Sequence, residues 1–264
     1  MLHNKKICFL FVLLFALAGN SYAENWGFSG GAGVKYQTVD FEIANISFSP
    51  LFVSNSLNFT AFKDNFYMSV EHDISTKDHQ ELTISANEAQ FINMGRTDTN
   101  FTVGFLATSS LNVFAGYKLA TLNAKLDTVL DPDFTGDNAP RAQDVEFKDS
   151  GFYVGASYTQ RFGDSGALSY SAAYADMDGE VSFTGAEYDP GTNTIKTFSA
   201  KTEGTTSGIS LGITWSDSFS ESSTYNVAFK VNLYEFEDEA LTTGENMSTK
   251  ETFTILSIGL SKYF

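Results

Sequence analysis

Apolar and polar residues alternate with a period of two along most of this chain, and this alternation constrains the fold more than any other feature. Between residues 101 and 119, two alternating runs flank the short polar turn Thr108-Ser109-Ser110. Period two is the side-chain repeat of a β-strand, so two such runs joined by a short turn predict a β-hairpin. The sequence predicts three further hairpins over residues 57–70, 152–174 and 209–233, and single strands over 26–36 and 256–264.

The pattern gives ten strands, with eight and twelve as alternatives. The segments between hairpins are longer and polar, and we expect them to be loops: residues 38–54, 76–99, 122–150, 179–205 and 237–250. Within the fourth, residues 181–183 and 195–198 flank the turn sequence 189–192 and predict a hairpin that continues above the membrane. Short turns on one side and long loops on the other are typical of an all-β, closed, antiparallel, up-and-down transmembrane barrel. An open sheet edge would leave N–H and C=O groups unsatisfied in hydrocarbon, so the first and last strands should pair.

The first residues have the pattern of a secretory signal. Lys5 and Lys6 precede an apolar stretch over residues 7–17, and Ser21-Tyr22-Ala23 is a small-x-small cleavage sequence. The apolar stretch is shorter than the roughly 20 residues that cross a bilayer as a helix. We therefore expect residues 1–23 to be a cleaved signal peptide and residues 24–264 to form one barrel domain.

Charge and cysteine content exclude several function classes. Removal of residues 1–23 leaves 14 basic residues against 32 acidic ones, a formal charge of −18, which argues against nucleic acid as a partner. The only cysteine, Cys8, lies in the expected signal, so thiol chemistry is excluded. The acidic segment Asp131-Pro-Asp133-Phe-Thr-Gly-Asp137 lacks the spacing and the closing Glu of a calcium loop, and we expect neither a metal site nor a cofactor.

The two faces of the predicted strands differ in composition. One face carries Leu, Val, Ile, Phe and Tyr, and the other is rich in Gly and Ser. A transmembrane barrel points the apolar face to lipid, whereas a soluble barrel would point it inward, and periodicity alone fits both. Aromatic residues near both strand ends favour the membrane, as two aromatic girdles would: Trp26, Tyr158, Trp215, Tyr225 and Phe264 at the turn side, and Tyr36, Tyr117, Phe152 and Tyr174 at the loop side.

The end of the chain resembles the C-terminal signal of bacterial outer-membrane barrels, a strand of alternating apolar residues closed by a terminal Phe. The residues that carry the resemblance are Leu256, Ile258, Leu260, Tyr263 and Phe264, and Lys262 departs from the pattern. The resemblance implies the outer membrane of a Gram-negative bacterium, with lipid and lipopolysaccharide around the barrel. It also implies that the barrel-assembly machinery recognises the last strand.

Charged residues on the polar face are the candidate functional residues. We expect seven to point into the lumen: Lys35, Glu71, Asp73, Arg96, Asp98, Lys118 and Lys230. They form either a salt-bridged plug or the lining of a narrow pore. The preferred function is a porin-like passive channel for small solutes, and the alternative is a non-conducting barrel with an adhesive or structural role through its acidic loops. The sequence specifies neither the solute nor the oligomeric state.

A third hypothesis is an outer-membrane enzyme. His72, Asp73, Asp78 and His79 lie close together in sequence, and ten-stranded proteases of the omptin family use Asp and His groups at the extracellular rim. No second pair of acids stands out to complete such a site. A lipid-modifying enzyme would need His and Ser on one face, and residues 71–75 do not offer them. We therefore predict no catalytic residues.

Overall fold

The computed structural model describes residues 26–43, 46–76, 78–85, 88–130, 140–189, 192, 194–238 and 248–264. The predicted signal peptide lies outside these ranges. The described residues form one twelve-stranded sheet, and no helix among them is long and apolar enough to span a bilayer. The strands are β1 (Gly27–Ile43), β2 (Ile46–Phe48), β3 (Leu51–Lys63), β4 (Phe66–Ser75), β5 (Asp78–Ser85), β6 (Glu88–Leu106), β7 (Leu111–Leu130), β8 (Pro140–Phe162), β9 (Gly166–Asp189), β10 (Thr194–Ser220), β11 (Ser223–Asp238) and β12 (Ser248–Tyr263).

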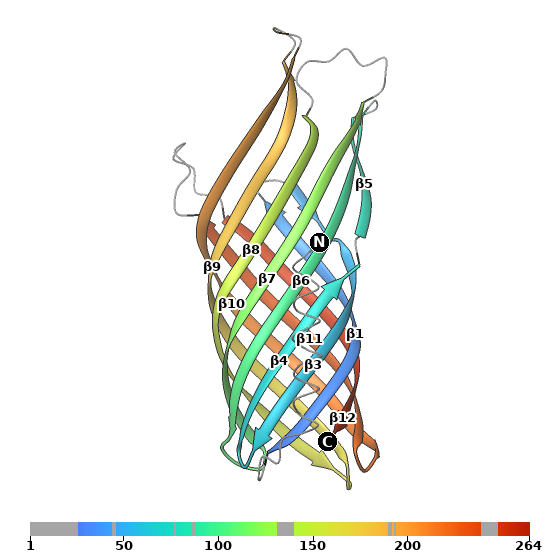
Figure 1. Cartoon of the computed structure of the whole chain (residues 1–264), viewed down its shortest axis with the longest axis vertical. Coiled ribbons are helices and arrows are strands. Elements are labelled where there is room, and N and C mark those ends of the chain that lie inside the picture. The colour runs from blue at the N-terminus through green and yellow to red at the C-terminus, as the bar shows by residue number, and fades with distance from the viewer. Residues whose placement is uncertain are drawn as a thin grey trace.

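Ten of these strands close into an antiparallel barrel, as predicted (Figure 1). The order around the ring is β1-β3-β4-β6-β7-β8-β9-β10-β11-β12, and β12 pairs with β1 from Ser29↔Tyr263 to Ile43↔Thr249. The short strands β2 and β5 pair with the upper parts of β1 and β6. Every strand of the ring therefore has a neighbour on both sides, and closure leaves no edge in the lower part of the barrel.

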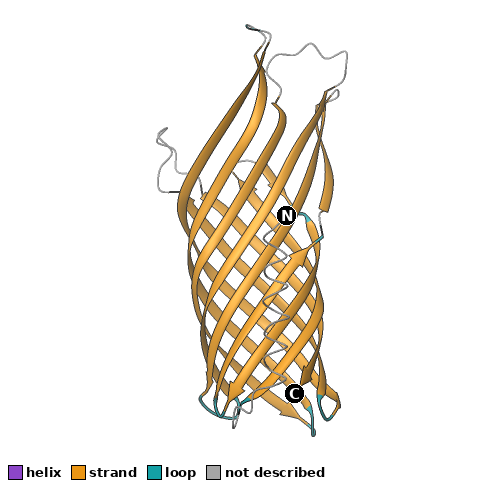
Figure 2. Cartoon of the chain, in the orientation of Figure 1, coloured by secondary structure: helices purple, strands orange, loops and turns teal. Residues whose placement is uncertain are grey.

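Four tight turns connect the hairpins at one end of the barrel (Figure 2). They lie at residues 64–65, 107–110, 163–165 and 221–222, where the sequence predicts them. Gly163 has a φ of 61°, which glycine adopts without strain. The chain also ends on this side, since Phe264 N donates to Phe28 O at 2.9 Å.

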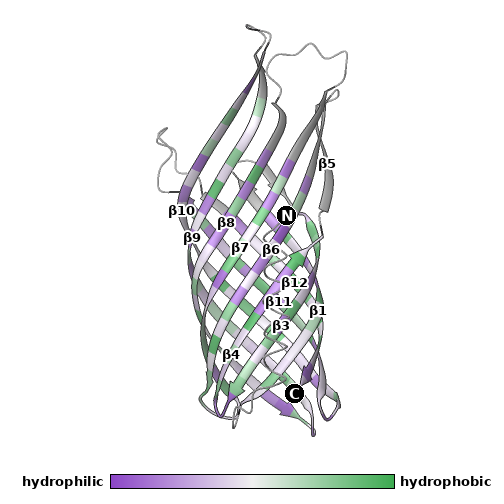
Figure 3. Cartoon of the chain, in the orientation of Figure 1, coloured by the Kyte–Doolittle hydropathy of each residue, from purple (hydrophilic) through white to green (hydrophobic). Residues whose placement is uncertain are grey.

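An apolar belt covers the outside of the lower barrel, and Figure 3 shows its hydrophobic residues in green, alternating along the strands with more polar ones. Its side chains point outward and are well exposed, such as Phe152 at 72%, Val154 at 59% and Ile258 at 53%. On β8 the belt extends from Phe162 to Phe152, which rises roughly 33 Å along the strand and about 24 Å along an axis tilted by about 45°. That height matches the roughly 25 Å apolar band of a transmembrane barrel.

Above the belt the strands continue, and the prediction of long loops is wrong for much of these segments. Residues 88–99, 122–130 and 140–150 are β-strand rather than loop, whereas residues 179–189 and 194–205 form the upper hairpin that the sequence predicts. Strands β7 to β10 reach highest in Figure 1. In this upper part the composition of the two faces is exchanged. On β9, Asp176 and Asp178 point outward and are exposed, whereas Met177 and Val181 point inward and are buried.

The closing contact can be tested with a disulfide. Val34 on β1 faces Ile258 on β12, and directly opposed antiparallel residues have Cα atoms about 4.5–5.5 Å apart, within the range of a disulfide. We expect the Val34→Cys, Ile258→Cys double variant of the mature chain to form an intramolecular disulfide on oxidation, seen as a reducible mobility shift of the denatured protein. The control pair Val34→Cys, Ile213→Cys lies on non-adjacent strands and should form none; equal cross-linking of both pairs would contradict the topology.

Candidate functional site

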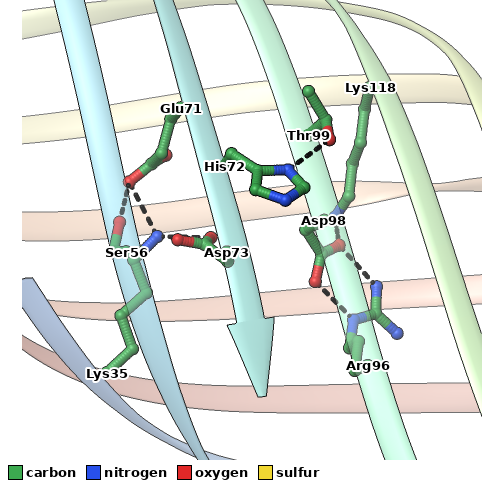
Figure 4. A network of polar contacts seen from close by, with 9 residues as sticks. All are labelled: Lys35, Ser56, Glu71, His72, Asp73, Arg96, Asp98, Thr99 and Lys118. Carbon is green, nitrogen blue, oxygen red and sulfur yellow. Dashed lines mark hydrogen bonds and ion pairs between the residues drawn. The ribbon is translucent and has the colours of Figure 1, made fainter. Parts of the chain in front are cut away.

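The seven charged residues predicted for the lumen all lie on inward-facing positions. Their positions follow from strand alternation, because their neighbours in sequence, such as Tyr36, Val70 and Leu119, belong to the outer face. Six of the seven form ion pairs or hydrogen bonds with one another, in two groups (Figure 4). We call these six residues the charge layer: Lys35, Glu71, Asp73, Arg96, Asp98 and Lys118.

The first group is centred on Lys35 of β1. Its Nζ lies 2.7 Å from Glu71 Oε1 and 2.6 Å from Asp73 Oδ2, both on β4. Ser56 of β3 donates to the same Glu71 oxygen at 3.4 Å. Because β3 lies between β1 and β4, this group joins three adjacent strands across the lumen face of the wall.

The second group is centred on Asp98 of β6. The Arg96 guanidinium donates through Nε to Asp98 Oδ2 at 2.7 Å and through Nη2 to Oδ1 at 3.0 Å. Lys118 Nζ lies 3.5 Å from Asp98 Oδ1. Both cations also lie over aromatic rings: Arg96 is 4.4 Å from the Phe253 ring centre and Lys118 is 5.2 Å from that of Tyr234.

A cluster of buried apolar side chains lies above the charge layer, inside the barrel. Phe52, Phe253 and Met94 are at most 1% exposed, and Tyr234 packs edge-on against Phe253 with ring centres 5.8 Å apart. We call this cluster the apolar plug: Val39, Phe52, Met94, Leu122, Ala124, Val145, Ala175, Met177, Val181, Tyr234, Phe236 and Phe253. Sequence analysis missed it, because most of these residues lie in or beside segments predicted to be loops. The signal in the sequence that indicates the plug is the alternation of these apolar residues with polar residues that point outward.

A polar cavity of about 540 Å³ lies in the lumen beneath the plug. Tyr234 and Phe253 of the plug line it together with the charge layer. Hydroxyl and amide groups line much of the rest, among them Ser69, Asn100, Thr102, Asn112, Ser157, Ser169, Ser171, Thr214 and Ser257. Small polar side chains leave this part of the lumen open, whereas large apolar ones fill the part above it.

His72 and Asp73 do not form a catalytic pair, because they point to opposite sides of β4. His72 faces outward, and its Nδ1 lies 2.8 Å from Thr99 Oγ1 on β6. Asp73 faces inward to Lys35. The side chains of Asp78 and His79 lie outside the described residues, as does the segment 131–137. Among the described side chains, no group of three or more His, Cys, Asp or Glu residues is placed to hold a metal ion.

The C-terminal strand lies in the wall between β11 and β1. Leu256, Ile258 and Leu260 point outward and are 44–57% exposed, while Tyr263 and Phe264 lie at the short-turn end. These five residues are therefore accessible on the outer surface or at the rim. Their recognition by an assembly machinery stays a prediction.

Outward-facing charges form a ladder above the belt on β8, β9 and β10. Lys201 Nζ lies 2.7 Å from Glu203 Oε1 and 3.0 Å from Glu180 Oε2. Lys148 lies beside both Glu146 and Glu180. Charged side chains at these outward positions are compatible with water but not with hydrocarbon, so the ladder marks a level outside the apolar belt.

No protein-family model and no curated protein matches this chain. Solved structures match over nearly the whole length. The outer membrane protease OmpT from Escherichia coli superposes with a TM-score of 0.59 and 9% identity, over 92% of this chain and 98% of that one. The translocator domain of the autotransporter NalP from Neisseria meningitidis gives 0.51 and 8% identity, over 98% and 96%. At such low identity the likeness shows a shared fold, that of outer-membrane β-barrels.

The charge layer can be tested through Asp98. Asp98→Asn removes the carboxylate shared by Arg96 and Lys118, and breaking a buried pair typically costs about 3–5 kcal/mol. We expect the free energy of unfolding, measured by urea titration of the barrel in phospholipid vesicles, to fall by roughly 3 kcal/mol.

Two controls accompany this variant. Lys148→Gln breaks ion pairs of a side chain that is 45% exposed, and should change the free energy of unfolding by less than about 1 kcal/mol. The double variant Arg96→Met, Asp98→Leu removes both charges of one pair and should lose less stability than Asp98→Asn. Equal stability of Asp98→Asn and the unmodified protein would refute the role of the pair.

Proposed function

We propose that this chain, which has the fold of bacterial outer-membrane β-barrels, is an outer-membrane protein of a Gram-negative bacterium whose lumen is closed to solutes and whose upper strands face the outside of the cell. The apolar plug carries this proposal. A passive channel needs a continuous aqueous path, and Phe52, Met94 and Phe253 are almost fully buried inside the barrel. This packing supports a surface-exposed barrel with an adhesive or structural role.

The porin-like channel predicted from the sequence is the second candidate. The polar cavity beneath the plug favours it, since hydroxyls, amides and charges line about 540 Å³ of lumen. Conduction would require the plug to move aside. The paired charge layer gives less support to a pore, because five of its six members are engaged at 3.0 Å or less with an oppositely charged neighbour.

An enzyme has less support than either candidate. OmpT, with which this chain shares its fold, is named a protease. In this chain the sequence-adjacent His72 and Asp73 point to opposite faces of the wall. Water activation needs a base and an orienting partner within hydrogen-bond reach of the same site.

The proposed orientation places the short turns in the periplasm and the upper strands outside. The outward-facing charges of β8, β9 and β10 then lie at the level of the lipopolysaccharide head groups, and the C-terminal strand lies where the assembly machinery of the periplasmic side would meet it. The apolar belt would contact the lipid chains. Lipid, lipopolysaccharide and the assembly machinery are proposed as partners because of this orientation, and not because of a specific pocket.

The orientation can be tested by labelling single cysteines in the mature chain, which has no cysteine of its own after signal removal. Ser199 lies exposed on the upper part of β10, and Asp164 lies exposed in a short turn. We expect a membrane-impermeant maleimide to label Ser199→Cys on intact cells, and Asp164→Cys only after the outer membrane is permeabilised. The reverse pattern would overturn the orientation, and labelling of neither variant on intact cells would overturn the surface location.

The closed lumen can be tested by conductance in planar bilayers. We expect the unmodified protein to insert without a steady current, and the variant Phe52→Ala, Met94→Ala, Phe253→Ala to conduct, because the plug then lacks its largest fully buried side chains. Each substitution is expected to cost about 2–5 kcal/mol, so folding is checked by resistance to SDS, and Phe253→Ala alone provides a milder variant.

The matched control for conductance is Leu211→Ala, Ile213→Ala, Ile258→Ala, which truncates three side chains of the outer belt. This control should remain silent. A steady current from the unmodified protein would refute the closed barrel and support the porin-like channel. A folded plug variant that never conducts would show that other residues close the lumen.

A further inference from the structure

We infer that the lumen cavity contains a binding site for a small soluble oxyanion, a carboxylate or phosphate, anchored by Lys230 of β11. This inference goes beyond the proposed function, since a barrel closed by its plug can still hold a solute in the cavity beneath. The wall of the barrel is paired all round, so the phosphates of membrane lipids are separated from this cavity.

Lys230 differs from the other lumen cations. Lys35, Arg96 and Lys118 each have a carboxylate oxygen within 3.5 Å. Among the described residues Lys230 has no ion pair, although its side chain lines the same cavity and is exposed within it. A charge in a narrow lumen needs either water or a counter-ion, and this one lacks a protein carboxylate.

Charged groups of both signs act electrostatically on Lys230. Lys35 and Lys118 repel its charge, whereas Tyr234 and Glu71 attract it. Glu71 Oε1 already accepts from Lys35 at 2.7 Å and from Ser56 at 3.4 Å. Of the described residues, four cations and three carboxylates line the cavity, an excess of one positive charge that favours an anion even though the whole chain is strongly acidic.

The wall beside Lys230 also provides space and donors. Gly212 of β10 lies directly opposite Lys230, and a Cβ at Gly212 would meet Ser171 Oγ at 2.7 Å and Lys230 Cγ at 3.8 Å. The missing side chain thus lets the Ser171 hydroxyl lie close to the backbone directly opposite the lysine. Ser169, Thr214 and Ser257 add further hydroxyl donors to the cavity. An ammonium group with nearby hydroxyls is suited to bind a carboxylate or a phosphate through charge-assisted hydrogen bonds.

The site can be tested by NMR on the folded mature chain in detergent micelles, with lysines dimethylated by ¹³C-formaldehyde, which keeps their charge. Inorganic phosphate and acetate are titrated separately against sodium chloride at equal ionic strength. We expect one dimethyl-lysine signal to shift saturably with phosphate, acetate or both, but not with chloride. Saturation by phosphate alone identifies a phosphate site, and saturation by acetate identifies a carboxylate site.

Three variants assign the signal. It should be absent in Lys230→Met and unchanged in Lys262→Met, a control at the exposed end of β12. Gly212→Val keeps Lys230 but displaces the Ser171 hydroxyl opposite it, and should weaken the apparent affinity about tenfold, the equivalent of one charge-assisted hydrogen bond. A shift that is linear, that is equal with chloride, or that persists in Lys230→Met would overturn the site. Full affinity in Gly212→Val would overturn it as well. None of these readouts depends on whether the barrel conducts, so failure of the closed-lumen proposal and failure of the anion site can be told apart.

Discussion

The antiparallel pairing of β1 with β12 is the contact on which the rest of the molecule depends. Backbone N–H and C=O groups in hydrocarbon have no water to bond, so a sheet can lie in a bilayer only if its first and last strands meet. Here they meet from Ser29↔Tyr263 to Ile43↔Thr249, well beyond the apolar belt. Closure creates an interior, and the charge layer, the cavity and the apolar plug all lie within it.

The environment changes along each strand, and the side chains change with it. Along the body of each ring strand, the positions that point inward are fixed by the period of two. Within the belt the outer positions are apolar, as with Val154 on β8, and the inner ones small or polar. Above the belt, on the same strand, Lys148 points outward and Val145 inward. The lower barrel thus has the apolar outer surface of a membrane protein, whereas the upper barrel has a polar outer surface and an apolar interior, like a water-soluble β-protein.

The exchange of polar and apolar residues between the two faces explains which features of the fold could be predicted from the sequence. The hairpins around Asp64, Ser109 and Gly163, the number of strands in the ring and the inward positions of residues such as Lys35 and Asp98 all follow from alternation and turn chemistry. The upper parts of β6, β7 and β8 differ from the predicted loops, because their outward residues, such as Glu146 and Lys148, are as polar as those of loops. Alternation itself continued through them.

The partners of individual charges could not be predicted from the sequence. Arg96 and Asp98 are two residues apart on one strand, so alternation places them on one face, but the contact of Arg96 with the Phe253 ring depends on how strands distant in sequence meet across the lumen. The same holds for Lys35, whose carboxylate partners belong to a strand that is not its neighbour. Such contacts depend on barrel diameter and stagger, which are properties of the closed sheet.

The apolar plug draws Val39 from the first strand of the ring and Phe253 from the last. Its packing is therefore incomplete until the two ends of the chain have come together. Hydrophobic burial inside the barrel and hydrogen bonding between the terminal strands then stabilise the same step, so partly closed forms gain little from either. This long-range coupling should make folding slow and strongly cooperative, with the C-terminal strand completing the wall and the core at once.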